Sequence, residues 1–160
     1  MGIQKTNVGR ILDQRKIKYK LYQIPFQDKH IDAVTVAIDL GLPPEIIYKT
    51  LVTKGDKTGV VVACIPGNQE LDLKLLAKVS QNKKMEMLPI KDLESVTGYI
   101  RGGCSPIGMK KQFPTFIADV AESQERILIS AGKRGFQVGL NPQALAEVIQ
   151  VQFVSISRTM

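Results

Sequence analysis

Two apolar runs separated by a short polar turn constrain the fold of this chain more than any other feature of its sequence. The runs are Tyr48 to Thr53 and Gly59 to Ile65, and residues 54–58 between them read Lys-Gly-Asp-Lys-Thr. Short runs rich in valine, isoleucine and threonine that flank a glycine-containing turn are typical of a β-hairpin. The sequence therefore predicts two antiparallel strands in its first half.

Shorter patterns along the rest of the chain predict further strands and helices. Alternating or continuous apolar runs favour strands at residues 17–24, 115–118, 127–130, 136–140 and 151–156. Capping residues and helical spacing favour a helix that begins after Thr6 or Asn7, a short helical turn at Pro43-Pro44, and helices at 32–40, 72–79, 91–96 and 141–149. Strands outnumber helices and several are joined as hairpins. We therefore expect an α+β fold, a mixed β-barrel or sheet surrounded by helices.

The length and charge of the chain limit how many domains it can form and what kinds of partner it suits. We expect residues 1–160 to form a single domain, since this length suffices for one core and leaves little room for two. No run approaches the ~18 apolar residues of a membrane helix, and the N-terminus lacks the apolar core of a signal peptide, so we expect a cytoplasmic protein with no membrane contact. The net charge of +7 is compatible with an ordinary surface, and it also suits a nucleic acid.

Cysteine and histidine are too few for the usual disulfide and metal sites. Cys64 and Cys104 lie far apart, no CxxC pair exists, and His30 is the one histidine. We therefore expect no disulfide framework and no metal. His30 is either a general base or a solvated loop residue. In the second case neither cysteine has an activating base, which argues against a Cys–His nucleophile.

Three segments hold residues that can carry chemistry. Lys49 stands inside an apolar strand, where it either reaches solvent at a sheet edge or holds a phosphate or an oxyanion in a pocket. Residues 102–108, Gly-Gly-Cys-Ser-Pro-Ile-Gly, form either a structural turn or a loop whose backbone N–H groups face a carbonyl or phosphate oxygen. Residues 130–135, Ser-Ala-Gly-Lys-Arg-Gly, combine glycine with two cations, a pattern that ordinary basic hairpin turns share.

Taken in order, these segments resemble the YbaK/EbsC family of aminoacyl-tRNA deacylases, relatives of the editing domain inserted in bacterial prolyl-tRNA synthetases. The resemblance covers nearly the whole chain and is carried by Ile47-Tyr48-Lys49-Thr50-Leu51, Gln69-Glu70-Leu71-Asp72-Leu73-Lys74, Thr97-Gly98-Tyr99, and the loops at 102–108 and 130–135. Each motif is weak alone, but the five in this order are specific. The resemblance implies a mixed β-barrel with surrounding helices, no cofactor, and release of a mischarged amino acid from tRNA by a hydrolase or lyase reaction.

The resemblance also implies a set of site residues and a substrate. Lys49 is expected to be catalytic, and the substrate is expected to contact Tyr22, Phe26, Thr50, Gly102, Gly103, Ser105, Ser130, Gly132 and Lys133. The best-known substrate of the family is cysteine mischarged on proline tRNA, whose own thiol attacks the ester carbonyl and leaves as a cyclic thiolactone. Mischarged tRNA is then the expected partner, with prolyl-tRNA synthetase as a second candidate. Gln137 departs from the family pattern, which often has an acidic residue at that position.

Two other classes of function fit the same sequence. One is a non-catalytic module that binds tRNA or a nucleotide, and the other is a regulatory protein built on the same fold. The intact motif around Lys49 favours the enzyme over both.

Overall fold

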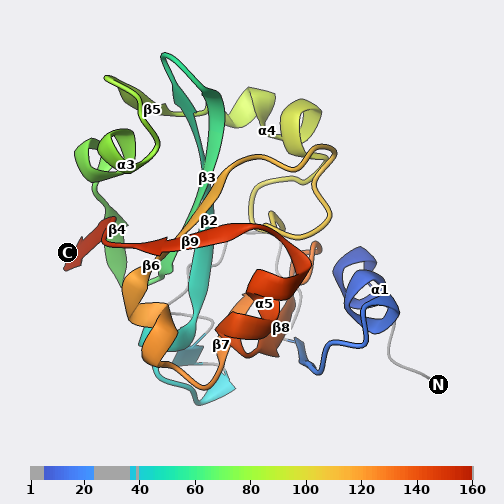
Figure 1. Ribbon diagram of the computed structural model, residues 1–160. Helices are drawn as coiled ribbons and strands as arrows, with labels where there is room; N and C mark the ends of the chain where they lie inside the picture. Colours follow the sequence, from blue (N-terminus) through green and yellow to red (C-terminus); the bar gives the residue numbers. More distant parts are fainter. Residues whose placement is uncertain (1–5, 24–36, 39, 160) are drawn as a thin grey trace.

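The described strands form three sheets, and helices lie around them (Figure 1). The computed structural model describes residues 6–23, 37–38 and 40–159. The helices, with η for 3-10 helices, are α1 (Asn7–Gln14), η1 (Pro44–Ile46), α3 (Leu73–Val79), α4 (Ile90–Thr97), η2 (Asp119–Ser123) and α5 (Pro142–Val148). The strands are β1 (Lys20–Gln23), β2 (Tyr48–Gly55), β3 (Gly59–Pro66), β4 (Gln69–Leu71), β5 (Met85–Met87), β6 (Thr115–Ala118), β7 (Ile127–Ser130), β8 (Phe136–Leu140), β9 (Val151–Val154) and β10 (Ser157–Thr159).

The predicted hairpin forms the middle of a five-stranded sheet ordered β5-β2-β3-β6-β9. β2 and β3 pair antiparallel, from Tyr48 opposite Pro66 to Gly55 opposite Gly59, so both strands are slightly longer than predicted. β6 pairs with β3 and β9 pairs with β6 in parallel. The sheet is therefore mixed, as the sequence pattern indicated.

The remaining strands form two smaller antiparallel sheets, ordered β1-β8-β7 and β10-β4. A single parallel bridge between Ile47 and Leu128 connects the start of β2 to β7. The α+β prediction is confirmed, but no sheet closes into a barrel within the described residues. Closure requires both edge strands of a sheet to pair with each other, and β5, at one edge, is only three residues long.

Side-chain caps begin three helices at the residues predicted for them. Thr6, Asp72 and Asn141 each accept a hydrogen bond from a backbone N–H two or three residues further along the chain. Such caps satisfy donors that have no partner within the helix. The helix predicted at 32–40 falls mostly on residues that the structure does not describe.

Two predicted strands differ from those observed. β1 begins at Lys20 rather than at residue 17, because Lys16 has a positive φ of 58° and the N–H of Ile17 still donates to Leu12 at the end of α1. The strand predicted at 151–156 ends at Val154, and after two residues outside any strand a further strand, β10, begins at Ser157 and pairs with β4. A pattern of apolar residues does not reveal such a change of partner.

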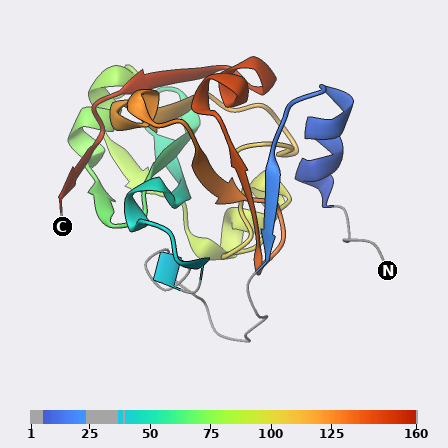
Figure 2. The same cartoon turned by 90° about the horizontal axis from the view of Figure 1, so that it is seen from below.

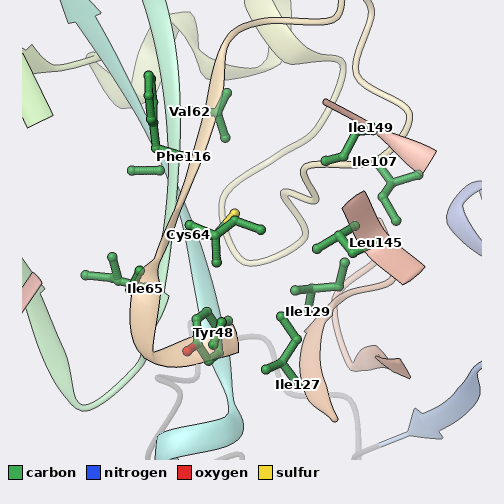
Figure 3. Packing of buried hydrophobic residues seen from close by; sticks show 14 of the residues in the cluster. Tyr48, Val62, Cys64, Ile65, Ile107, Phe116, Ile127, Ile129, Leu145 and Ile149 are labelled. Atoms are coloured by element: carbon green, nitrogen blue, oxygen red, sulfur yellow. The ribbon is translucent and has the colours of Figure 1, made fainter. Parts of the chain in front are cut away.

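The hydrophobic core lies between the five-stranded sheet and the three-stranded sheet (Figure 3). Its buried side chains come from both sheets, from the loop after α4 and from α5, and they include Tyr48, Val62, Cys64, Ile65, Ile107, Phe116, Ile127, Ile129, Leu145 and Ile149. Figure 2 shows α1 and β1 beside β8, at the end of the molecule opposite β10. No described helix is long and apolar enough to cross a membrane.

Candidate active site

A cavity of about 400 Å³ opens beside the first half of β2. Its lining comes from β2, the turn after β3, the segment from β5 into α4, the loop after α4, and the facing ends of β7 and β8. The lining residues are Ile47, Tyr48, Lys49, Thr50, Leu51, Val52, Gly67, Met87, Leu88, Ile90, Leu93, Arg101, Gly102, Cys104, Ser130 and Gln137.

The pairing of β2 explains why the cavity lies here. β3 covers one edge of β2 over its whole length, whereas β5 pairs on the other edge only with Thr53–Gly55. The N–H of Leu88 donates to Val52 where that pairing ends, and Ile47 bridges to β7 at the opposite end of the strand. The cavity lies along the stretch between these two contacts.

Lys49 is a half-buried cation in the wall of this cavity. β5 pairs with β2 only at Thr53–Gly55, so no described strand of the sheet covers the cavity edge of β2 at Lys49. Its Nζ donates a hydrogen bond to the main-chain oxygen of Gly67 at 3.4 Å. The strand and the turn together hold the ammonium group inside the cavity, where it can interact with a phosphate or a developing oxyanion.

Two thiols lie at or near the cavity, and both are poor nucleophiles. Cys104 lines the cavity, and Cys64 is buried on β3, with its Sγ 3.8 Å from Oγ1 of Thr50. Burial raises the pKa of the Cys64 thiol to about 12 and that of the Cys104 thiol to about 11. Because the thiolate is the reactive form, neither sulfur is activated near neutral pH.

The two glycine-containing loops that the sequence singled out pack against each other. Gly102 has a φ of 87°, and a Cβ atom there would lie 3.0 Å from Nε of Arg134. The same Nε donates to the main-chain oxygen of Arg101 at 3.0 Å. Gly103 packs on the backbone of the 133–134 turn, where a Cβ atom would lie 3.3 Å from the nearest atom. Small residues at 102 and 103 thus allow the two loops to form one wall.

Four of the predicted site residues line the cavity, namely Lys49, Thr50, Gly102 and Ser130. The Oγ of Ser130 accepts a hydrogen bond from the N–H of Gly132 at 3.1 Å, so the turn fixes that hydroxyl at the end of β7. Sequence motifs from three distant parts of the chain therefore meet in one place.

Five other predicted residues do not line this cavity. Ser105 is fully buried and accepts from a backbone N–H of its own loop, and Gly103 packs between loops. Tyr22 lies on β1, and its hydroxyl accepts a 2.6 Å hydrogen bond from an arginine side chain. Gly132 packs against an aromatic ring, and the ammonium of Lys133 lies over the ring of Phe136. Phe26 and His30 lie outside the described residues.

Gln137 is the most informative residue that the sequence did not place in the site. It lines the cavity, and its Oε1 is buried without a hydrogen-bond partner in the described structure. β8 pairs Gln137 with Ser130 of β7, so the hairpin register carries it to the same wall. The signal that could have placed Gln137 in the site was its position two residues after the Lys-Arg-Gly turn, where the family often has an acidic residue. Arg101, Cys104 and the apolar residues at 87, 88, 90 and 93 also line the cavity and were not predicted as site residues.

The cavity presents charged, polar and apolar groups to a ligand. The described residues contain no group of three or more histidine, cysteine, aspartate or glutamate side chains that could hold a metal ion. The lining combines cations at Lys49 and Arg101, an acceptor at Gln137, hydroxyls at Thr50 and Ser130, and an apolar side.

Comparison with protein families gives this arrangement its context. The family model described as an aminoacyl-tRNA editing domain matches residues 31–148. The chain belongs to this editing family. The match includes the strand with Lys49, both glycine-containing loops and Gln137, so the resemblance seen in the motifs is confirmed.

One curated relative of this editing-family chain is similar over nearly its whole length. It is a protein of Enterococcus faecalis with the provisional name Cys-tRNA(Pro)/Cys-tRNA(Cys) deacylase EbsC. The two are 57% identical over 154 residues, which cover 96% of this chain and 94% of the relative.

Solved structures share the editing-family fold at low sequence identity. The crystal structure of a hypothetical protein superposes with a TM-score of 0.84 at 19% identity, over 94% of this chain and 99% of that one. A crystal structure provisionally described as a trans-editing enzyme for prolyl-tRNA synthetase superposes with a TM-score of 0.82 at 18% identity, over 97% of this chain and 99% of that one. At these identities the likeness is one of fold.

Proposed function

We propose that this chain is a trans-editing deacylase that removes mischarged cysteine from proline tRNA. The observation that carries the proposal is Lys49, held by Gly67 in the wall of a cavity of about 400 Å³ that Gln137 also lines. Membership of the editing family and the provisional name of the 57% identical relative support the same reaction and substrate.

Lys49 and Gln137 have complementary roles in this proposal. The Lys49 ammonium interacts with the ester carbonyl oxygen as it gains negative charge, or with the adjoining phosphate. The buried oxygen of Gln137 accepts a hydrogen bond from the amino group of the aminoacyl moiety, which provides a partner that this oxygen lacks among the described residues. The two groups then hold the aminoacyl ester between them.

The nucleophile in this mechanism is the thiol of the substrate. Its sulfur forms a bond to the carbonyl carbon, the bond to the ribose oxygen breaks, and the thiol proton passes to that oxygen. The products are a cyclic thiolactone and tRNA with a free terminal hydroxyl. The raised pKa values of Cys64 and Cys104 support this route, because they leave the protein without an activated thiol of its own.

Cysteine is a reasonable target because a synthetase discriminates poorly between side chains of similar size. Binding alone gives only ~10–200-fold discrimination for near-isosteric substrates. A second site that depends on a reactive thiol rejects proline, which has none. The net charge of +7 suits binding of the tRNA itself, and prolyl-tRNA synthetase is a further partner in this proposal.

Deacylation of a panel of charged tRNAs tests the proposal. Purified protein is incubated with proline tRNA that carries cysteine, alanine, proline or S-methylcysteine, and release of the amino acid is followed. We expect cysteine to be released at least about 100-fold faster than S-methylcysteine, which has the same backbone but lacks a free thiol. Equal release of both would exclude attack by the substrate thiol, and release of neither would favour a binding or regulatory protein.

A further inference from the structure

The outer edge of the five-stranded sheet at β9 has no partner strand in the described part of the chain. β6 pairs with one edge of β9, from Thr115 beside Val151 to Ala118 beside Val154. The other edge is the end of the sheet, and no hydrogen bond from the described residues reaches its backbone. β9 runs across the front of the molecule in Figure 1 and along its upper margin in Figure 2. The backbone N–H and C=O groups of this edge are therefore free to pair with another strand.

β9 also lacks the charged residues that usually protect such an edge. Its four residues read Val-Gln-Phe-Val, with no charge and no proline. The other exposed edge strands of the three sheets each carry a charge, namely Lys20 in β1, Glu70 in β4, Glu86 in β5 and Arg158 in β10. The remaining edge strand, β7, is fully buried. Because charges on edge strands oppose unwanted pairing, β9 is the unprotected edge among the described strands.

Apolar side chains beside this edge remain partly open to solvent. Val151, Phe153 and Val154 pack against the core but are only half-buried. Val120 lies on η2, which contacts β9, and is 46% exposed. Burial of apolar surface favours association of proteins. The edge therefore offers a partner both hydrogen-bonding groups and apolar contact.

We propose that β9 is a dimer interface, at which it pairs antiparallel with β9 of a second copy of this chain. Two identical antiparallel strands are related by a two-fold axis, so the donors of each copy face the acceptors of the other. The same axis brings any charge on the strand close to its own copy, which opposes self-association. The absence of charge on β9 removes this obstacle and favours a second copy over a charged protein or a nucleic acid.

This pairing joins two five-stranded sheets into one continuous sheet and leaves both cavities open. The cavity lies beside β2, on the side of that strand toward β5, whereas β9 is at the opposite edge of the sheet. Dimer formation and chemistry at Lys49 are therefore separable. The dimer goes beyond the proposed function and does not depend on it.

Sedimentation velocity of the full chain over a range of concentrations tests the dimer. We expect a monomer at low concentration and a particle of twice its mass as the concentration rises. The interface is built on a short strand, so we expect a Kd on the order of 10 μM. A chain that stays monomeric up to about 500 μM would overturn the inference.

A charge placed at Gln152 tests whether β9 forms the interface. Gln152 is exposed near the middle of β9, so in the antiparallel pair it lies close to Gln152 of the second copy. Gln152→Lys should raise the Kd about fivefold or more, through repulsion of like charges. An equimolar mixture of Gln152→Lys and Gln152→Glu should restore association, because the facing charges are then opposite.

The matched control is Gln14→Lys, which adds the same charge at an exposed position on α1 and should leave the Kd unchanged. Hydrogen exchange locates the interface independently. Amides of β9 that point away from β6 should exchange more slowly in the dimer than in the monomer. A dimer that Gln152→Lys leaves intact, or one that protects only other strands, would exclude β9 as the interface.

The two proposals fail in different ways. Release of cysteine per protomer should be the same for wild type and Gln152→Lys, because β9 does not line the cavity. A dimer that releases no cysteine would contradict the deacylase function alone, and a monomer that releases cysteine would contradict the dimer alone.

Discussion

The ammonium nitrogen of Lys49 lies 3.4 Å from the main-chain oxygen of Gly67. The N–H of Gly67 in turn donates to the main-chain oxygen of Ile47 at 2.7 Å. Gly67, in the turn after β3, therefore hydrogen-bonds to both neighbours of Tyr48, Ile47 and Lys49. This arrangement orients the cation before any substrate arrives. A charge that is already in place costs little reorganisation when negative charge develops in a transition state.

Replacement of this cation should therefore remove most of the activity and leave the fold intact. We expect Lys49→Ala to lower kcat/KM for Cys-tRNA(Pro) by about 100-fold or more, the usual effect of losing a donor to an oxyanion. Lys54→Ala, which removes an exposed lysine from the same strand, is the matched control and should retain wild-type activity. A folded Lys49→Ala protein with more than about a third of wild-type activity would contradict the assignment.

Gln137→Leu should make the protein more stable and less active. The substitution removes a buried oxygen that has no hydrogen-bond partner in the part of the chain that the structure describes, so the free energy of unfolding should rise by about 1 kcal/mol. It also removes the proposed acceptor for the substrate amine, so KM should rise roughly tenfold. Urea unfolding and steady-state kinetics measure the two effects, with the exposed Gln143→Leu as control. A destabilised variant with unchanged KM would exclude this role for Gln137.

The thiols of the protein should be dispensable for catalysis. We expect the double variant Cys64→Ser with Cys104→Ser to keep most of the single-turnover rate, because burial keeps both thiols protonated near neutral pH. Rates are compared at saturating tRNA, and binding is measured separately. A collapse of the rate with normal binding would instead indicate a covalent intermediate on Cys104, which lines the cavity.

Alkaline pH should destabilise the fold through Cys64. Its thiol has an ordinary pKa of 9.0 when unfolded and a pKa of about 12 in the buried site. Between these values the unfolded chain releases the proton and the folded chain keeps it, so stability is lost as pH rises above 9. The slope reaches at most about 1.4 kcal/mol per pH unit for this group. Urea unfolding from pH 8 to about 10.5 should show a shallower decline for Cys64→Ala. Parallel curves for the two proteins would show that Cys64 does not contribute.

Lys110 and its neighbour Lys111 should contribute to tRNA binding. Lys110 donates from Nζ to the main-chain oxygen of Ser95 at 3.4 Å, which places it along α4, the helix that supplies Ile90 and Leu93 to the cavity. Phosphate contacts release counterions, so we expect affinity to fall with salt at a slope set by about two to four phosphates.

Removal of the charges of Lys110 and Lys111 should flatten the salt dependence of tRNA affinity. Lys110→Ala with Lys111→Ala should raise KM and leave single-turnover chemistry at saturating tRNA much less affected. The matched control is Lys57→Ala with Lys74→Ala, which removes two exposed lysines from the β2–β3 turn and from α3. Superimposable salt titrations for wild type and the Lys110/Lys111 variant would show that Lys110 and Lys111 do not contact the tRNA.

The local features of this protein could be predicted because each depends on neighbouring residues. The hairpin of β2 and β3 followed from two apolar runs and a glycine turn, and α5 followed from Asn141 and Pro142. Lys49 was recognisable as a cation in an apolar strand, and the glycines at 102 and 103 as a loop of unusual backbone shape. These signals operate over one turn of helix or a few residues of strand, where propensity and capping act.

Only the tertiary structure decided which of these features meet and what lies between them. The pairing of β7 with β8 brought Gln137 to Ser130, the packing of Gly102 against Arg134 joined two loops, and the short β5 left room for the cavity along β2. No local pattern encodes these contacts, because they depend on strand register and on which edges pair. The sequence by itself therefore determined the β2–β3 hairpin, the three helix caps and the cation at Lys49, while long-range packing decided which residues form one cavity.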